Sequence, residues 1–309
     1  FHQDFQGEVL MQTPPLYVFL RYLAAISIVS IFMFPILWWG LTSVKPTSAI
    51  FNKDGIVFFD FIPTLDNYRV TVLGANPSEL SGGNTGSGTT MGTGGENSYD
   101  GRRTIMDSII VAVGSTIVTT TLALLAAYPL SRMVFTGSQA YMNWILSQRF
   151  LPPIAIIVPL VFMFHDLGIR DTHIGLIIVH ALINLPIALL LLKSFLDDVP
   201  KDVDQAAMID GATRWQSFRL VVLPMIRGGV AATAVLCFVF SWTEFLLSLF
   251  LTSSIRTLPV KITTFVTSTG SEWGFISALG TSAMLPSFIF ILLVQRHLVR
   301  GLTMGAIKD

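Results

Sequence analysis

The chain has 309 residues, of which 52% are hydrophobic and only 12% are charged, and its formal net charge is zero. A soluble domain carries roughly 25% charged residues, so a protein this apolar must have most of its surface in lipid. The zero net charge argues against a nucleic-acid partner held by a basic surface. Cys237 is the single cysteine, which excludes an internal disulfide and a cysteine-cluster metal site. The composition predicts an integral membrane protein.

Six segments between charged residues are long and apolar enough to cross a bilayer, for which a helix needs about 20 apolar residues. The first is too long for the apolar core of a signal peptide and is predicted to be a retained span. Prolines in the third are predicted to kink or end its helix, as are Pro186, Pro259 and Pro286 in theirs. Six is an even number, so both termini are predicted to lie on one side. The segments are 22–41, 107–132, 143–165, 174–192, 228–251 and 275–294.

The loops on the side of the termini hold more Lys and Arg than the short loops opposite, so the positive-inside rule places both termini in the cytoplasm. Residues 76–101 are rich in Gly, Ser, Thr and Asn, a composition that predicts a mobile insert. The predicted organisation is a cytoplasmic N-terminal segment (1–19), a first transmembrane helix (20–42), an extracytoplasmic loop (43–104), a five-helix core (105–299) and a cytoplasmic tail (300–309).

The cytoplasmic loop at 193–227 carries helix signals. Asp202, followed three residues later by Gln205, predicts an N-terminal cap for a short helix at about 203–209. Gly211 then offers the left-handed conformation that commonly ends a helix. The first half of the loop is therefore predicted to be a capped helix that ends in a glycine turn.

The second half of the loop repeats the capping pattern at Thr213 and Gln216. A second short helix should run from there towards Leu223, just before Pro224. The predicted object is a hairpin of two short helices joined by a glycine turn.

This hairpin offers a surface on which another protein could dock. Ala206 and Ala207 are small enough for close approach, and Trp215 and Phe218 are of the aromatic type that anchors interfaces. The alternative is an amphipathic hairpin lying on the membrane surface. An anionic leaflet would favour an excess of Lys and Arg, whereas the loop's five positive residues are balanced by five aspartates. A protein partner is therefore favoured.

The hairpin resembles the EAA loop of binding-protein-dependent ABC importers, a pattern of Glu-Ala-Ala, then Asp-Gly-Ala, then Leu-Pro. The chain departs from the pattern at its first position, where Gln stands for Glu, and Asp204 beside it keeps an acid nearby. The matching positions are Gln205-Ala206-Ala207, Asp210-Gly211-Ala212 and Leu223-Pro224.

The resemblance extends along most of the chain and is most specific to the second, six-span permease of maltose-type carbohydrate importers. The fifth segment is similar to a Trp-Asn-Glu-Phe pattern of that family, with Thr243 in place of Asn. The segments that carry the resemblance are 63–68, 126–128, 131–132, 241–245 and 301–308.

The resemblance implies an all-α fold of six transmembrane helices, of the type I ABC importer permease kind, in a bacterial or archaeal inner membrane. A solute-binding protein would deliver a carbohydrate or polyol to this permease and a second permease, and an ATPase dimer would drive the pair between its states. ATP and Mg would bind to the ATPase, so this chain is expected to be no enzyme and to hold no cofactor or metal. The resemblance assigns ATPase coupling to Asp204, Gln205, Ala206, Ala207, Asp210, Gly211, Trp215 and Pro224, and an ATPase contact to Gly305, Ala306, Ile307 and Lys308.

Two ionisable residues, Arg149 and Glu244, fall well inside the spans, where charges are costly and mark functional sites by default. Glu244 either accepts hydrogen bonds from substrate hydroxyls or clamps the partner permease. Arg149 is expected to extend to the cytoplasmic interface, at a different depth from Glu244. The predicted substrate pathway is Ser241, Trp242, Thr243 and Glu244, and the scarcity of charge there fits a mostly neutral solute.

His180 and Cys237 are predicted to be buried core residues, because neither has metal ligands at useful spacing. A further group of four polar residues is predicted to form a solvated turn rather than a metal site. These four are His165, Asp166, Asp171 and His173.

Two other classes of protein compete with the permease interpretation. An ATPase is excluded because no Gly-rich phosphate loop ending in Gly-Lys-Ser/Thr occurs. An ion-gradient-driven secondary transporter of a small polar solute is the alternative, because such proteins also have proline-broken spans. It would leave the capped cytoplasmic hairpin without a task.

Overall fold

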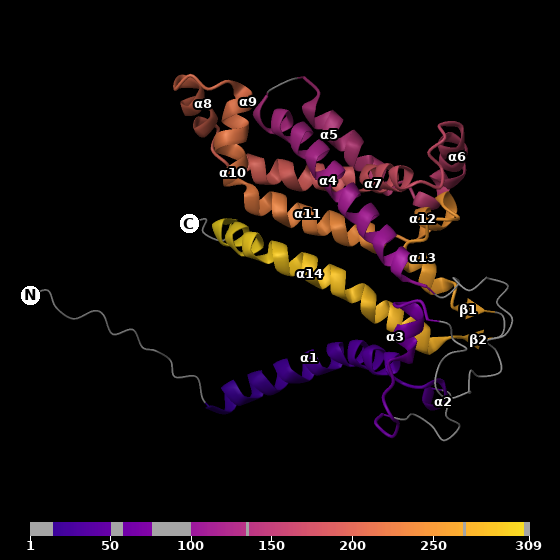
Figure 1. Ribbon diagram of the computed structural model, residues 1–309. Helices are drawn as coiled ribbons and strands as arrows, with labels where there is room; N and C mark the ends of the chain where they lie inside the picture. Colours follow the sequence, from indigo (N-terminus) through magenta and orange to yellow (C-terminus); the bar gives the residue numbers. More distant parts are fainter. Residues whose placement is uncertain (1–14, 51–57, 76–99, 134–135, 268–269, 306–309) are drawn as a thin grey trace, which may run out of the picture.

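The structure is a computed structural model that describes residues 15–50, 58–75, 100–133, 136–267 and 270–305. Helices dominate the described chain (Figure 1). Four of them are long and apolar enough to cross a membrane. The predicted mobile insert lies almost entirely outside the described residues. The four long helices are α1 (Pro15–Ser43), α4 (Arg102–Arg132), α7 (His173–Asp197) and α14 (Trp273–Gly305).

The third predicted span is a pair of helices bent by 94°. Its first part is α5 (Ser138–Ser147) with the short η2 (Gln148–Phe150), and its second part is α6 (Pro153–Asp166). Pro152 and Pro153 stand at the bend, where their missing N–H groups and fixed φ prevent a continuous helix. The prediction that prolines break this span is confirmed.

The fifth span was expected as one continuous segment at 228–251, and this prediction is wrong. The span is divided into α11 (Arg227–Trp242) and α12 (Leu246–Leu251), with Glu244 in the break. The Glu244 carboxylate accepts hydrogen bonds from the N–H groups of Leu247 at 2.8 Å and Ser248 at 3.1 Å. These are the donors that a helix start leaves unpaired, so the side chain begins a new helix instead of continuing the old one.

A second bent pair joins the loop at 193–227, which is predicted to be cytoplasmic, to the fifth span, with an angle of 76° between 214–225 and α11. When each bent pair counts as one span, the structure has up to six candidate spans, in agreement with the six predicted from the sequence.

α4, α7 and α11 form the centre of the molecule, with α14 beside α11 and α1 beside α14 (Figure 1). α4 and α7 make the most extensive helix contact. α7 and α11 approach each other closely at Gly229 of α11, where the Phe195 ring of α7 occupies the space that a Cβ would need. A buried apolar cluster extends from these helices into the cytoplasmic loop. Its members include Ala127, Leu192, Leu196, Val222 and Cys237.

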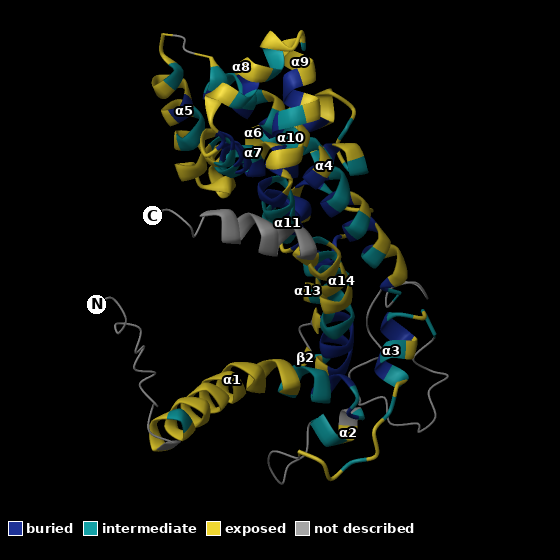
Figure 2. Ribbon diagram, turned by 90° about the vertical axis from the view of Figure 1, so that its left-hand side faces the viewer, coloured by how far each residue is buried: buried dark blue, intermediate teal, exposed yellow. Residues whose placement is uncertain are grey.

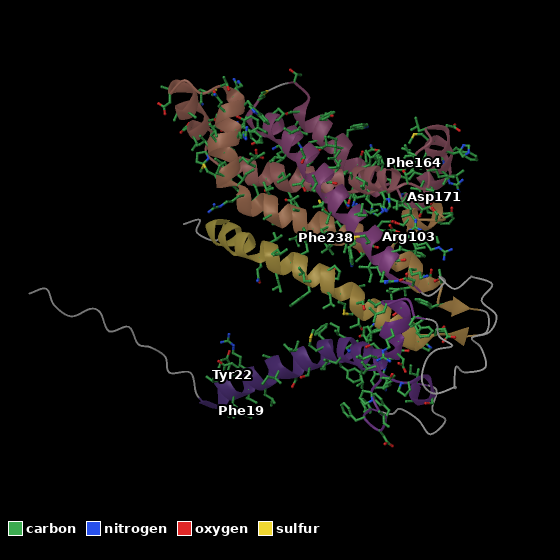
Figure 3. The ribbon with its side chains drawn as sticks, in the orientation of Figure 1. Phe19, Tyr22, Arg103, Phe164, Asp171 and Phe238 are labelled. Carbon is green, nitrogen blue, oxygen red and sulfur yellow. The ribbon has the colours of Figure 1, made fainter. Side chains whose placement is uncertain are left out.

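α1 contrasts with this centre, because none of its apolar window is buried within the chain. The helix is exposed along most of its length (Figure 2). Most of its exposed residues are apolar, with Arg21, Ser27 and Ser30 as exceptions. Phe19 and Tyr22 lie apart from the core helices (Figure 3). Such a surface is stable in lipid or against another apolar helix, but not in water.

Short elements gather at the end of the molecule opposite the cytoplasmic loop (Figure 1). They include two strands paired antiparallel, with Val266 opposite Ser271 and Thr267 opposite Gly270. These elements are α2 (Thr47–Ile50), α3 (Asp66–Thr71), α13 (Leu258–Thr263), β1 (Val266–Thr267) and β2 (Gly270–Ser271).

Asp171 connects two loops at this end. Its carboxylate accepts hydrogen bonds from the backbone N–H groups of Ser253 (2.9 Å), Ser254 (3.0 Å) and Ile255 (3.3 Å), and its φ of 58° is in the left-handed region. Burial alone would raise the pKa of Asp171, but these hydrogen bonds outweigh it and hold the pKa below its ordinary value. The loop between α6 and α7 is thereby fixed to the loop after α12.

The start of α1 and the end of α14 lie toward the same end of the molecule as the cytoplasmic loop (Figure 1). α14 remains helical to Gly305, through the first residues of the predicted tail at 300–309. Of the four predicted tail contacts, Gly305 is the last helical residue, and Ala306, Ile307 and Lys308 lie outside the described residues.

Candidate functional site: a helical hairpin and an intramembrane cavity

The predicted cytoplasmic loop is a helical hairpin that closes at Gly211. This glycine has a φ of +92°, the left-handed conformation predicted from the sequence. After it the chain passes through a π-helical turn, η3, before it bends into α11. The hairpin consists of α8 (Lys201–Ile209), α9 (Arg214–Ser217), η3 (Phe218–Val222) and α10 (Leu223–Met225).

Of the two predicted caps, the second is confirmed and the first is wrong. Thr213 and Gln216 form a reciprocal capping box, with bonds of 3.3 Å and 2.7 Å. α8 instead starts directly after Pro200, without a side-chain cap. Pro200 has a fixed φ and precedes the first helical residue. Asp202 lies in the first turn, where its negative charge interacts favourably with the helix dipole but its side chain caps no backbone N–H group.

Asp204 is a buried anchor of the hairpin. Its carboxylate forms an ion pair with Arg132 of α4, with Nε and Oδ2 2.7 Å apart and both side chains less than 10% exposed. Tyr128 and Ser217 donate hydrogen bonds to the other carboxylate oxygen at 2.9 Å and 3.1 Å. Arg132 also donates to the carbonyl of Leu196 at 2.9 Å, near the end of α7. One carboxylate therefore joins α8, α9 and the end of α4.

The aromatic residues of the hairpin divide into one buried and one exposed. Phe218 is buried against Tyr128, with ring centroids 4.6 Å apart, so the expectation that it offers an interface is wrong. Trp215 lies beside Phe218, with ring centroids 5.3 Å apart and the ring planes tilted by 40°, but it is 56% exposed. Trp215 is therefore the aromatic group that the hairpin presents outward.

The remaining residues assigned to ATPase coupling lie at the surface of the hairpin. Ile209 is 85% exposed and was missed by the sequence analysis. Its position three residues after Ala206, on the same helical face, was the available signal. Gln205, Ala206, Asp210, Gly211 and Pro224 are exposed, and Ala207 is half-buried.

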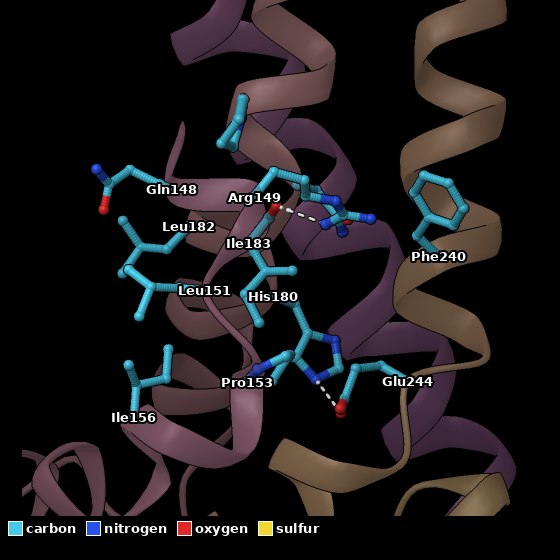
Figure 4. Close-up of a pocket in the computed structure, with 12 residues that line it drawn as sticks. Gln148, Arg149, Leu151, Pro153, Ile156, His180, Leu182, Ile183, Phe240 and Glu244 are labelled. Carbon is cyan, nitrogen blue, oxygen red and sulfur yellow. Dashed lines mark hydrogen bonds and ion pairs between the residues drawn. The ribbon is translucent and has the colours of Figure 1, made fainter. Parts of the chain in front are cut away.

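A second candidate site is a cavity of about 540 Å³ between the bent third span, α7 and α11 (Figure 4). Both helix breaks reach it, the first through Arg149 and Pro153 and the second through Glu244. Its lining residues are Gln148, Arg149, Leu151, Pro153, Ile156, His180, Leu182, Ile183, Asn184, Pro186, Phe240 and Glu244.

Glu244 and His180 meet at one wall of this cavity, with Oε2 and Nε2 3.3 Å apart. The Nδ1 atom of His180 lies 2.7 Å from the Oγ of Ser241, to which Ser115 of α4 donates at 2.8 Å. His180 is buried, as predicted, but it belongs to a polar network that connects α4, α7, α11 and α12. Its partners are distant in the sequence, so spacing gave no signal for this network.

Arg149 occupies the opposite part of the cavity. Its guanidinium donates to the carbonyl of Ile183 at 3.0 Å and lies 5.4 Å from the centre of the Phe240 ring. Ile183 is 10 residues from the start of α7 and 14 from its end, roughly 15 Å and 21 Å at about 1.5 Å per residue. The prediction that Arg149 extends to the cytoplasmic interface is therefore wrong, because the bend of the third span turns it towards the middle of α7.

The predicted pathway residues separate in the structure, and of the four only Glu244 is among the cavity residues named above. Ser241 is buried in the polar network, and Trp242 is buried against Phe238, with ring centroids 5.5 Å apart. Thr243 is exposed and donates back to the carbonyl of Val239 at 2.8 Å.

The four polar residues of the α6–α7 region are also drawn apart. His173 pairs with Asp107 of α4 at 2.8 Å, while Asp171 holds the 253–255 turn. His165 and Asp166 are both exposed. Within the described ranges, no group of three or more His, Cys, Asp or Glu side chains could hold a metal ion.

The fold and the site define a class: a multi-pass membrane protein with a cavity among its spans and a helical hairpin that is largely exposed. The profile of the family described as "Binding-protein-dependent transport system inner membrane component" matches residues 119–304. That match covers more than half of the chain, so the chain belongs to this family, the permeases of ABC importers. The family comprises transport permeases rather than enzymes. Its members are components of binding-protein-dependent systems, which speaks against a self-sufficient secondary transporter.

Two curated sugar-transport permeases are similar to this chain along nearly its whole length. The trehalose transport system permease protein SugB of Mycobacterium tuberculosis is 32% identical over 280 residues, covering 89% of this chain and 92% of SugB. The sulfoquinovosyl glycerol transport system permease protein SmoH of Agrobacterium fabrum is 32% identical over 291 residues, covering 94% and 93%.

A solved structure has the same fold. It is a crystal structure of a bacterial ABC transporter involved in the import of the acidic polysaccharide alginate. The TM-score is 0.67 at 16% identity, over 95% of this chain and 99% of the solved one. The type I importer permease fold predicted from the sequence is thereby confirmed.

Proposed function

We propose that this chain is one of two permease subunits of an importer for a carbohydrate or polyol. A solute-binding protein outside the membrane delivers the substrate, and an ATPase dimer that binds ATP and Mg drives the two permeases. The chain lies in a cytoplasmic (inner) membrane with both termini and the hairpin in the cytoplasm. Relatives whose names state trehalose, sulfoquinovosyl glycerol and diacetylchitobiose transport support a sugar-like substrate.

The observation that carries this proposal is the form of the hairpin. Its exposed surface combines small, apolar and aromatic groups at Ala206, Ile209 and Trp215, which suit docking into a cleft on another protein. Its underside is fixed to α4 through the Asp204–Arg132 pair. A rigid body held to a spanning helix at one side and open at the other can transmit a movement of the ATPase.

Asp204 has a different role from the other residues that the resemblance assigns to ATPase coupling. Its carboxylate is buried, pairs with Arg132 and accepts hydrogen bonds from Tyr128 and Ser217. We therefore infer that Asp204 positions the hairpin and does not contact the ATPase. Gln205, Ala206, Asp210 and Gly211 then supply the docking surface, together with Ile209.

Copurification and uptake test the proposal. A tagged chain, extracted in mild detergent, should bring down a second permease and an ATPase. Proteoliposomes of that complex should take up substrate only with ATP and the binding protein, and thermal-shift screening of the binding protein should identify a sugar or polyol. Uptake by this chain alone, driven by an ion gradient, would contradict the proposal and favour the secondary transporter.

A further inference from the structure

The intramembrane cavity lies where two broken spans meet (Figure 4). Backbone that is not helical is tolerated at membrane depth only where protein buries it or where it lines a water-filled cavity. Discontinuous helices form substrate sites near the bilayer midplane in many transporters. The volume of about 540 Å³ falls within the roughly 300–1,000 Å³ typical of small-molecule sites. The position and size of the cavity therefore suit a polar solute.

The carboxylate of Glu244 in this cavity is already engaged by its own chain. One oxygen accepts from the N–H of Leu247, and the other accepts from the N–H and the hydroxyl of Ser248 and meets His180. These contacts hold the break between α11 and α12 in place. Glu244 is thus explained by local structure and need not bind a substrate.

Arg149 is different, because it lines the cavity with an exposed side chain. A guanidinium has five N–H donors, and the contacts that the structure describes for Arg149 are one backbone carbonyl, of Ile183, and the ring of Phe240. An Arg at this depth is costly unless something pairs with it. Its planar fork of donors matches a carboxylate or another oxyanion in two-point contact.

We propose that Arg149 is the anion-recognising group of this cavity, and that the transported carbohydrate carries an acidic group such as a carboxylate or sulfonate. The inference rests on the proposed function, because it narrows the class of the carbohydrate. It also replaces the expectation of a mostly neutral solute, which was based on the scarcity of charge in the predicted pathway.

The electrostatic part is tested without knowing the substrate. Gln148, a neighbour of Arg149 in the lining, is changed to Cys in the full importer complex, in which the native Cys237 is buried. The modification rate at position 148 is measured by mass spectrometry with two thiol reagents of similar size, an anionic sulfonatoethyl and a cationic trimethylammonioethyl methanethiosulfonate.

We expect the anionic reagent to react faster, and Arg149→Gln to lower the anionic-to-cationic rate ratio about tenfold, since removing a charge a few ångströms away changes the local potential strongly. Arg149→Lys keeps the charge and should retain the preference. Arg170→Gln makes the same charge change on an exposed loop and should leave the ratio unaltered. A cationic preference, or a ratio indifferent to Arg149→Gln, overturns the proposal.

An uptake experiment tests whether Arg149 recognises an acidic group of the transported substrate. Proteoliposomes with the complete importer receive trehalose, the matching disaccharide with one glucuronate unit, or its 6-sulfonate analogue, each with the binding protein. We expect an acidic probe to be taken up, with kcat/KM lowered about tenfold by Arg149→Gln, and comparison of the two probes shows which acid is preferred.

The outcomes of this uptake experiment are distinct. Import of trehalose alone, or equal sensitivity of all probes to Arg149→Gln, contradicts the acidic substrate but leaves the importer assignment intact. Failure of every probe to enter with ATP, under conditions in which the binding protein binds it, contradicts the proposed function itself.

Discussion

Asp204 shows how one side chain can determine what a surface loop does. It lies in α8, whose neighbouring residues Gln205 and Ala206 are exposed, yet it is 5% exposed and faces Arg132. Burying both charges costs desolvation free energy, which good geometry and added hydrogen bonds can offset. Tyr128 and Ser217 supply such bonds. The position therefore holds the hairpin rather than meeting a partner.

Asp204→Asn should lower the free energy of unfolding of the hairpin region by about 3–5 kcal/mol, because it leaves Arg132 buried without its counter-charge. Substrate-stimulated ATP hydrolysis in the reconstituted complex should fall while basal hydrolysis persists. Thermal unfolding and ATPase assays measure the two effects. Asp202→Asn removes the same charge from an exposed site on α8. It should lower the free energy of unfolding by less than about 1 kcal/mol and leave ATP hydrolysis unchanged. Equal behaviour of the two variants would contradict the anchor.

Asp171 supports a second prediction at the residue scale, at the opposite end of the molecule. Its folded pKa is lowered, so its contribution to stability is complete above the unfolded pKa of about 3.9 and is lost as the pH falls through the folded value. Asp171→Asn should therefore lower the Tm at pH 7 by about 3 °C or more, and the difference from the native chain should shrink in acid below about pH 4.

The matched control for Asp171 is Asp166→Asn, in the same region but with an exposed carboxyl. It should leave the Tm near that of the native chain across the pH range. A pH-independent difference between Asp171→Asn and the native chain would show that shape, not charge, matters at this turn.

At the scale of elements, most local signals were predictable, with the cap at Asp202 as an exception, and distant partners were not. The turn at Gly211 and the cap at Thr213 depend on residues within one helical turn, so the sequence predicted both correctly. The break at Glu244 depends partly on His180, and the anchor at Asp204 depends on Arg132, both far away in the chain. No spacing rule could bring such groups together before the helices were packed.

The glycine turn at Gly211 supports a prediction about the hairpin as an element. Gly211→Pro forces a φ near −65° where the hairpin needs +92°, so α8 and α9 should lose their fixed relation while the spans remain intact. The variant should stay in the membrane but lose most substrate-coupled ATP hydrolysis in the reconstituted complex. Gly137→Pro is the control, because Gly137 has a similar φ of +90° before α5, away from the hairpin. Normal coupling in Gly211→Pro would refute the hairpin as a lever.

At the scale of the whole molecule, α4 touches both candidate sites. Arg132 at its end holds the hairpin through Asp204, and Ser115 within it joins the Ser241–His180 network at the cavity wall. The two residues are 17 positions apart on one helix, roughly 25 Å at about 1.5 Å per residue. A packed helix that belongs to both sites is a physical route by which movement at one can change the other.

This connection predicts that the cavity senses the state of the ATPase through α4. With Gln148→Cys in the reconstituted complex, adding ATP should change the thiol modification rate about fivefold or more, a typical size of coupling between sites. Arg132→Gln should remove most of that change, because the hairpin can then move without α4, while the rate without ATP stays the same. Asp202→Asn, on the same hairpin, should preserve the full response. If the ATP-dependent change survives in Arg132→Gln, the movement reaches the cavity by α7 or α11 instead, the helices that precede and follow the hairpin and supply residues of the cavity lining.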